Sequence, residues 1–350
     1  MNFASDNAGP MHPSVLDAIV KANTGYEMPY GNDTIMPRVR DRVRATFEAP
    51  EAAVYLVATG TAANALALST YTNGWDAIFA HRVSHVEEDE CGAPEFYANG
   101  ARLSLVDGAG AKMDPDSLRH AIANTGNKDV HCVQRGPVTL TQATEVGTLY
   151  SLKEIAQITA IAKKYGLKTH LDGARFANAC AALGCSAAEM TWKSGIDMVS
   201  FGGTKNGCAG VEAVIFFDPE KAWEFELRRK RGAHLFSKHR FLSAQMEAYL
   251  QDDLWLELGA KANANCARLV KGLRTIAGAE IPDAPEANMV FARLPRAAHR
   301  RAMGAGAKYY LYPSDASLDG PDDEMIRCRM VCDWNKSGAE IDQLISLLRG

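Results

Sequence analysis

The chain has 350 residues, of which 47% are hydrophobic and 23% charged, and its formal net charge is −4 at pH 7. This composition is that of an ordinary globular protein, and so weak a charge argues against nucleic acid or an anionic membrane as the main partner. No apolar run approaches the ~20 residues that span a bilayer, and no signal peptide is visible, so we expect a cytoplasmic protein.

Short apolar runs alternate with helical segments along the first two thirds of the chain. The predicted strands are 54–58, 77–80, 103–106, 130–133, 138–140, 168–171, 198–201 and 213–217. Apolar residues at helical spacing predict a helix over 152–165. Strands that alternate with helices predict an α/β fold, with a mainly parallel sheet flanked by helices on both faces.

The pattern changes after Asp218. The elements expected there are a long charged helical stretch, two strands and a last helix, over 219–277, 288–294, 325–332 and from Ser337 onward. They predict a smaller C-terminal α+β domain. We therefore divide the chain into a large domain with an N-terminal arm, 1–240, and a small domain, 241–350, since single cores rarely exceed ~250–300 residues.

The eight cysteines form no pattern typical of metal or disulfide sites. Cys180 and Cys185 lie in an alanine-rich segment, and Cys328 and Cys332 flank R-M-V on a predicted strand. There is no C-x-x-C pair and no neighbouring histidine cluster, so we expect no metal. Small buried thiols in a reducing compartment are the better interpretation.

A carboxylate and a lysine follow two of the predicted strands. Asp172 ends the strand K-T-H-L and precedes G-A-R with Arg175, while Lys205 lies in the turn G-G-T-K-N-G after D-M-V-S-F. Pyridoxal phosphate needs an amine that forms a Schiff base and an anion that keeps its pyridine nitrogen protonated. The alternative is a buried strand and a surface turn with a solvated lysine.

Two further motifs can be placed around this pair. Gly60 and Thr61 lie in V-A-T-G-T-A-A-N, a predicted strand-to-helix turn that suits a phosphate or simply caps a helix. His85 follows another strand, where an imidazole could stack on a flat ring or carry a proton, or lie among acids in a loop. The acids at 87–90 are typical of a solvated helix start, although Glu90 could point inward.

Two more segments offer polar groups near substrate. Gln142, Thr144 and Glu145 follow a strand and can line the carboxyl edge of the sheet, where open α/β sheets bind ligands. Arg327 and Arg329 lie on the same side of a C-terminal strand, where one could clamp a carboxylate. The alternative is a solvent-facing edge strand whose basic residues discourage aggregation.

Taken in order, these motifs resemble the low-specificity L-threonine aldolases, pyridoxal-phosphate enzymes of fold type I in the β-eliminating lyase group. The resemblance covers most of the chain, and D-G-A-R followed by G-G-T-K-N-G is its most specific part. The other matching segments are F-A-S-D-N, N-G-W-D-A-I, H-V-E-E-D-E-C-G-A-P-E-F, T-Q-A-T-E-V-G-T, W-K-S-G-I-D and R-M-V-C-D-W. It implies reversible retro-aldol cleavage of L-threonine, L-allo-threonine or phenylserine to glycine and an aldehyde, by a homodimer or homotetramer.

The resemblance also implies a role for each matching residue. Lys205 would bind the cofactor covalently, Asp172 would contact its pyridine nitrogen, and His85 would stack on its ring. The other implied contacts are Arg175 with the phenolic oxygen, Gly60, Thr61 and Thr204 with the phosphate, Ser5 and Arg329 with the substrate carboxylate, and Tyr30, Gln142 and Thr144 near the substrate. Many relatives carry a histidine where this chain has 142–145, which leaves open which group takes the hydroxyl proton.

Two other functions share parts of this pattern. A fold-type-I transaminase or β-eliminating lyase would use the same lysine and aspartate but release a keto acid. A ligand-sensing module that retains the fold would bind the cofactor with little turnover.

Overall fold

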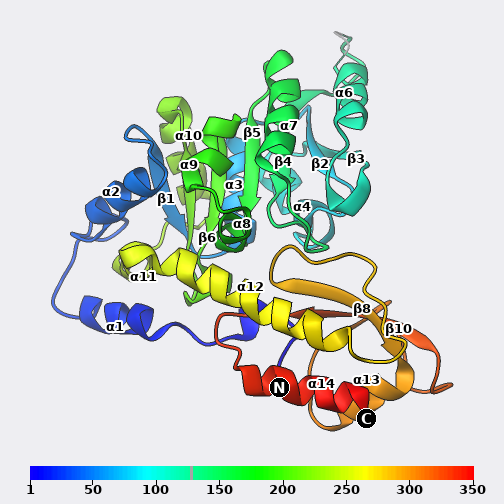
Figure 1. Cartoon of the computed structure of the whole chain (residues 1–350). Coiled ribbons are helices and arrows are strands. Elements are labelled where there is room, and N and C mark those ends of the chain that lie inside the picture. The colour runs from blue at the N-terminus through cyan, green and yellow to red at the C-terminus, as the bar shows by residue number, and fades with distance from the viewer. Residues whose placement is uncertain (127–128) are drawn as a thin grey trace.

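Seven strands form the central sheet, in the order β1-β7-β6-β5-β4-β2-β3 (Figure 1). The computed structural model describes residues 1–126 and 129–350. The strands are β1 Ala53–Val57, β2 Asp76–His81, β3 Arg102–Val106, β4 Gln134–Thr141, β5 Thr169–Gly173, β6 Met198–Gly202 and β7 Glu212–Phe216. Strands β2 to β6 pair in parallel, whereas β7 is antiparallel to both of its neighbours. The predicted mainly parallel sheet is confirmed.

Helices cover both faces of this sheet. They are α1 Pro13–Ala22, α2 Met36–Thr46, α3 Gly60–Thr70, α4 His85–Glu88, α5 Ala93–Tyr97, α6 Pro115–Asn124, α7 Leu152–Lys164, α8 Phe176–Leu183, α9 Ala187–Met190, α10 Ala222–Arg231 and α11 Arg240–Leu250. Alternate strand residues pack into two separate clusters, one with α3 and α10 and the other with α2, α7 and α8. Strands buried on both faces read as largely apolar runs, which explains why β6 and β7 were easy to predict.

Two predictions in these regions are wrong. Residues 130–133 form a turn, not a strand, and Val130 is fully exposed; the Gln134 amide holds this turn by donating to the carbonyl of Cys132 at 2.8 Å. The helical stretch predicted over 219–277 is three helices, because α10 ends at Gly232 and the positive φ angles of Asp252 and Asp253 break the chain again.

The smaller lobe is built on a three-stranded antiparallel sheet in the order β8-β10-β9. Its elements are α12 Leu254–Leu273, β8 Met289–Pro295, α13 Arg296–Gly304, β9 Tyr310–Tyr312, β10 Met325–Val331 and α14 Gly338–Arg349. The α+β prediction is confirmed, although β9 was not foreseen. Helix α12 contributes to the core of both lobes, so the division at residue 240 stays a prediction.

The N-terminal arm belongs to the core of the small lobe. Phe3 is fully buried there, its N–H donates to the Lys308 carbonyl at 2.7 Å, and its carbonyl accepts from Val331 at 2.8 Å. Figure 1 shows both chain ends at this lobe. The arm therefore runs from the small lobe toward the large one, and it carries Ser5 and Asp6 to the boundary between them.

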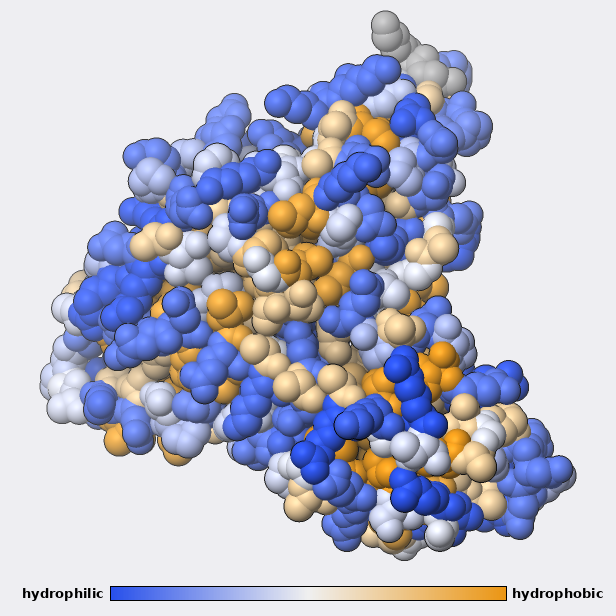
Figure 2. All heavy atoms as spheres, in the orientation of Figure 1, coloured by the Kyte–Doolittle hydropathy of each residue, from blue (hydrophilic) through white to orange (hydrophobic). Residues whose placement is uncertain are grey.

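The surface is mixed in character. Hydrophilic residues cover most of the face shown in Figure 2, with smaller hydrophobic areas between them. Among the described residues, no helix combines the length and apolarity that crossing a bilayer requires.

Candidate active site

The site lies at the carboxyl edge of the sheet, where β5 and β6 end side by side. Asp172 pairs in register with Ser200, and Lys205 follows in the one-turn helix Thr204–Asn206. A Cβ built on Gly202 would lie 2.5 Å from the Ala174 carbonyl oxygen, so only glycine lets the two turns approach this closely. The structure brings Asp172 and Lys205 to the same edge of the sheet.

Lys205 lies in an environment that favours its neutral amine. Burial, and then the positive charge of Arg175, lower the pKa of the Lys205 ammonium, while Asp6 and Asp172 act in the opposite direction. A lysine with a lowered pKa keeps more of its amine unprotonated at neutral pH, and the unprotonated amine is the nucleophile. The alternative interpretation of a solvated lysine is therefore wrong.

Asp172 is fixed by hydrogen bonds that leave its carboxylate little freedom. Its Oδ2 accepts from Asn64 Nδ2 at 2.8 Å, and its Oδ1 accepts from the Ala174 N–H at 3.0 Å. The same Asn64 amide donates to Glu90 Oε1 at 2.8 Å. Asn64 was missed from the sequence, although an asparagine inside the otherwise apolar helix α3 was a usable signal.

His85 and Glu90 extend this network. His85 Nδ1 lies 2.8 Å from Glu90 Oε1, and this bond raises the pKa of the imidazole. Burial raises the pKa of Glu90, whose side chain is fully buried. Polar atoms of His85, Glu90 and Asp172 all lie within 4.8 Å of one another. The inward orientation of Glu90 is confirmed, and His85 belongs to the site rather than to an acidic surface loop.

Arg175 forms a two-bond ion pair with an acid from the N-terminal arm. Its Nε and Nη2 donate to Asp6 at 2.7 and 2.9 Å, and Asn288 Nδ2 also donates to Asp6 at 3.1 Å. Although burial opposes the shift, Arg175 and Lys205 lower the pKa of Asp6. Asp6 was missed because its neighbours in sequence carry no sign of a partner 169 positions away.

The N-terminus of α3 faces open space. Thr59 is the capping residue, since its hydroxyl accepts from Ala62 N–H at 3.2 Å, and Gly60 and Thr61 are the first helical residues. The first N–H groups of a helix have no partner within it, and a Cβ on Gly60 would meet nothing within 4 Å. This end of the helix can bind an anion, as predicted.

Thr204 is engaged inside the lysine turn. Its hydroxyl accepts from Val211 N–H at 3.2 Å and bonds to the buried carboxyl of Glu212. Burial raises the pKa of Glu212 to about 7. Glu212, which sequence reasoning also missed, accepts from Gly203 N–H at 2.9 Å and so supports the turn that carries Lys205. An acid at the start of an otherwise apolar strand was the available signal.

Arg329 reaches the N-terminal arm. Its Nη2 donates to the Ala4 carbonyl at 3.2 Å, next to Ser5, and its guanidinium lies 5.1 Å from the Tyr310 ring centre. Its Nε is buried and has no hydrogen-bond partner among the described residues. Arg327 shares this face but is exposed and lies against Phe291. The structure thus brings Arg329 to the residue that precedes Ser5 in the N-terminal arm.

Three predicted substrate contacts are used elsewhere within this chain. The buried Gln142 amide exchanges hydrogen bonds with the Tyr150 backbone at 2.8 and 2.9 Å. The buried Thr144 hydroxyl bonds to Thr148 at 2.7 Å. Lys230 Nζ lies over the Tyr30 ring, 4.7 Å from the ring centre. Gln142 and Thr144 therefore shape the loop after β4 rather than line the site.

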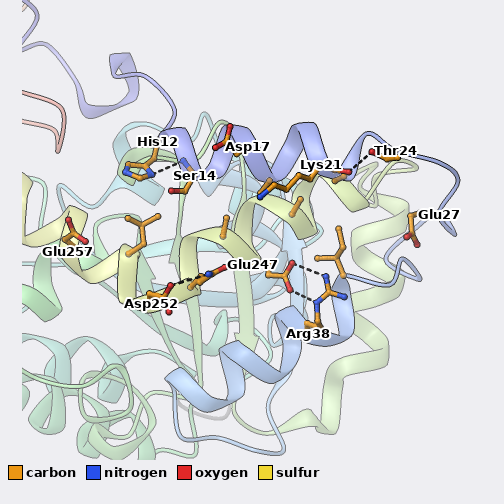
Figure 3. A pocket seen from close by; sticks show the side chains of 17 residues that line it. His12, Ser14, Asp17, Lys21, Thr24, Glu27, Arg38, Glu247, Asp252 and Glu257 are labelled. Atoms are coloured by element: carbon orange, nitrogen blue, oxygen red, sulfur yellow. Dashed lines mark hydrogen bonds and ion pairs between the residues drawn. The ribbon is translucent and has the colours of Figure 1, made fainter.

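A separate groove of about 800 Å³ lies between α1, α2 and α11 (Figure 3). Its polar lining includes the ion pair of Arg38 with Glu247, at 2.6 Å. The groove contains none of the residues assigned above. Next to the groove, His12 contacts the site, since its N–H donates to the Gly207 carbonyl of the lysine turn at 2.8 Å.

Known proteins resemble the whole chain. The family model for β-eliminating lyases matches residues 2–296. Low specificity L-threonine aldolases of Pseudomonas sp. and Pseudomonas aeruginosa are each 40% identical over 348 residues, which cover 99% of this chain and 96% of theirs. The threonine aldolase structure of Leishmania major has a TM-score of 0.89 at 26% identity and covers 99% of this chain and 98% of that one. The expected fold class is confirmed, and the chain belongs to the β-eliminating lyase family.

Proposed function

We propose that this protein is a pyridoxal-phosphate-dependent L-threonine aldolase. It cleaves L-threonine, L-allo-threonine and related β-hydroxy-α-amino acids such as phenylserine to glycine and an aldehyde, reversibly. The observation that carries the proposal is that Asp172 and Lys205, a lysine of lowered pKa, lie at the same sheet edge. The names of its full-length relatives support the reaction.

The residues present fit this cofactor. Lys205 offers the amine, Asp172 offers an anion for the pyridine nitrogen, and the open N-terminus of α3 suits the phosphate. Arg175 would lie beside the phenolic oxygen, and Thr204 would support the phosphate turn. When bound, pyridoxal phosphate supplies an electron sink for the pair of electrons that the cleaved carbon–carbon bond leaves on Cα.

The protein's own side chains orient the substrate and polarise the cofactor. Arg329 has a buried Nε with donor capacity to spare and would hold the substrate carboxylate together with Ser5. That contact places the Cα–Cβ bond relative to the cofactor plane. Asp172 supplies negative charge where the ring nitrogen must keep its proton. His85, fixed by Glu90, would cover the ring.

Product analysis tests this proposal. L-threonine, L-allo-threonine and L-phenylserine are each incubated with the enzyme beside their D-enantiomers, and glycine, aldehyde and keto acid are measured. We expect glycine and the matching aldehyde from the L-substrates. A keto acid as the main product would contradict the proposal and favour a transaminase or β-eliminating lyase. Cofactor binding with negligible turnover would favour a ligand-sensing module.

The active site is further proposed to lie at the interface of a homodimer, which can pair into a homotetramer. The supporting observation is a set of exposed apolar side chains on α1 and the loop after it: Leu16, Val20, Tyr26, Met28 and Tyr30. A twofold interface would present this surface to its own copy. Tyr30, whose ring lies against Lys230 in its own chain, would then contact substrate in the partner's site.

Subunit mixing tests this arrangement. Inactive Lys205→Ala and Tyr30→Ala subunits are combined, and partial activity is expected, because one site of each hybrid dimer receives both intact parts. A fully active monomer in sedimentation at assay concentration would refute the shared site, while failed complementation alone would reject Tyr30. We also propose a cytoplasmic location, supported by eight cysteines that form no disulfide within the described residues.

A further inference from the structure

Glu145 is a carboxyl group that the loop after β4 directs at the site. Its Oε1 accepts from the His85 backbone N–H at 2.7 Å. Its Oε2 is buried and has no hydrogen-bond partner among the described residues. Buried polar atoms are nearly always paired, so an unpaired carboxyl oxygen beside a ligand site points to a role in binding or chemistry.

Hydrogen bonds from both lobes hold the loop that carries Glu145. Within the loop, the Gln142 amide fixes the Tyr150 backbone. From the small lobe, Glu286 accepts from Leu149 N–H at 2.8 Å and donates its own N–H to the Gly147 carbonyl at 3.0 Å. A side chain held from both directions has the fixed position that proton transfer requires.

The same loop packs against the strands that carry the carboxylate clamp. Val146 contacts the cluster of Met289, Phe291 and Val331, and Phe291 pairs in register with Arg329. Glu145 therefore lies on the part of the chain that joins the His85 side of the site to the Arg329 side.

The charges around Glu145 suit proton exchange near neutral pH. The groups that face it are His85 from α4, Asp172 from β5, Arg175 before α8, and Tyr150 from its own loop. Burial, with a smaller contribution from Asp172, raises the pKa of Glu145 to about 7, against the effect of two backbone N–H groups and the Thr141 hydroxyl. A group with such a pKa is suited to accept and return a proton at neutral pH.

We propose that Glu145 takes the proton from the β-hydroxyl of the substrate, a role that rests on the proposed aldolase function. In the cleavage direction the O–H bond breaks as the aldehyde C=O forms, and the Cα–Cβ bond breaks. The electron pair stays on Cα, where the bound cofactor delocalises it, and the proton goes to Oε2. In the synthetic direction Glu145 returns the proton. This role accounts for a chain without histidine at 142–145.

The test compares Glu145→Gln with Glu145→Asp, and with Glu88→Gln as a control that removes an exposed acid nearby. For the wild type, kcat/KM with L-threonine should rise with pH through about 7, because the base must lose its proton. This rise is the acidic limb of the pH profile. Glu145→Gln should lower kcat/KM by about 10²–10⁴-fold and remove this acidic limb. Glu145→Asp should keep a limb at reduced rate, and Glu88→Gln should match the wild type.

A second measurement separates chemistry from structure. Glycine has no β-hydroxyl, so glycine binding, followed by the cofactor absorbance, and exchange of the glycine α-proton in D₂O should be unchanged in Glu145→Gln. The proposal is overturned if Glu145→Gln keeps the acidic limb and cleaves threonine within tenfold of the wild type. It is equally overturned if glycine binding and α-proton exchange fall as much as cleavage, or if Glu145→Asp shows no limb. Absence of glycine from threonine with the wild type would instead refute the aldolase function itself.

Discussion

The two halves of the site are built differently. The cofactor half lies within the large lobe, where Asp172, Asn64 and Glu90 are joined by hydrogen bonds at the ends of strands and on α3. The substrate half is assembled from the N-terminal arm and the small lobe, which meet at the Arg329–Ala4 and Asn288–Asp6 contacts. The cofactor half is therefore rigid on its own sheet, whereas the substrate half depends on how the arm joins the two lobes.

Asp6 connects the two halves, and its replacement should have the largest effect. Asp6→Ala leaves the guanidinium of Arg175 buried and unpaired, which typically costs about 3–5 kcal/mol of stability. We expect a lower denaturation midpoint together with weaker cofactor binding, measured by chemical unfolding and by cofactor titration. Exposed Asp17→Ala on α1 serves as the matched control. Unchanged stability of Asp6→Ala would show that the arm does not hold the halves together.

Asp172→Asn should damage the cofactor half alone. Its side chain keeps its size but loses the charge that stabilises the electron sink, and a lost contact of this kind costs about 2.7–4 kcal/mol in the transition state. We expect kcat for threonine to fall about 10²–10³-fold while the cofactor stays bound. Activity within twofold of the wild type would mean that another group keeps the ring nitrogen protonated.

Glu212→Gln should remove a pH-dependent loss of stability in the cofactor half. Burial raises the pKa of Glu212 from 4.5 to about 7. The folded protein thus binds the proton more tightly than the unfolded chain, and stability falls as pH rises between these values. The loss is at most about 3.5 kcal/mol, at ~1.4 kcal/mol per pKa unit. The free energy of unfolding of the cofactor-free protein, measured at several pH values, should decline less steeply with pH in Glu212→Gln than in the wild type. An identical decline in both proteins would contradict the account.

Arg329→Lys should damage the substrate half alone. A lysine cannot form the bidentate contact of a guanidinium, and losing one hydrogen bond to a charged group costs about 1.5–3 kcal/mol. We expect KM for threonine to rise about tenfold to a hundredfold with the cofactor absorbance unchanged. Arg327→Lys is the control on the same face. If Arg327→Lys gives this phenotype and Arg329→Lys does not, the clamp is assigned to the wrong arginine.

The same contrast explains what the sequence could predict. Asp172 and Lys205 were predictable because each follows a buried strand, and parallel strands end at one edge. Asp6 and Asn288 were missed because their contacts join segments 282 positions apart, which no local pattern encodes. Gln142 and Thr144 were given substrate roles because a strand end marks a position but not the direction of a side chain. The strand predicted at 130–133 failed because Val130, one of its two valines, is exposed and has no partner face to bury it.

The central claim is that the turns after β5 and β6 form the cofactor site with Lys205 as the point of attachment. The purified enzyme is treated with borohydride, which reduces the bond between cofactor and lysine, and the labelled peptide is then identified by mass spectrometry. The account predicts a label on Lys205, with no label and no activity in Lys205→Ala. A label on any other lysine, with Lys205→Ala still fully active, would contradict it.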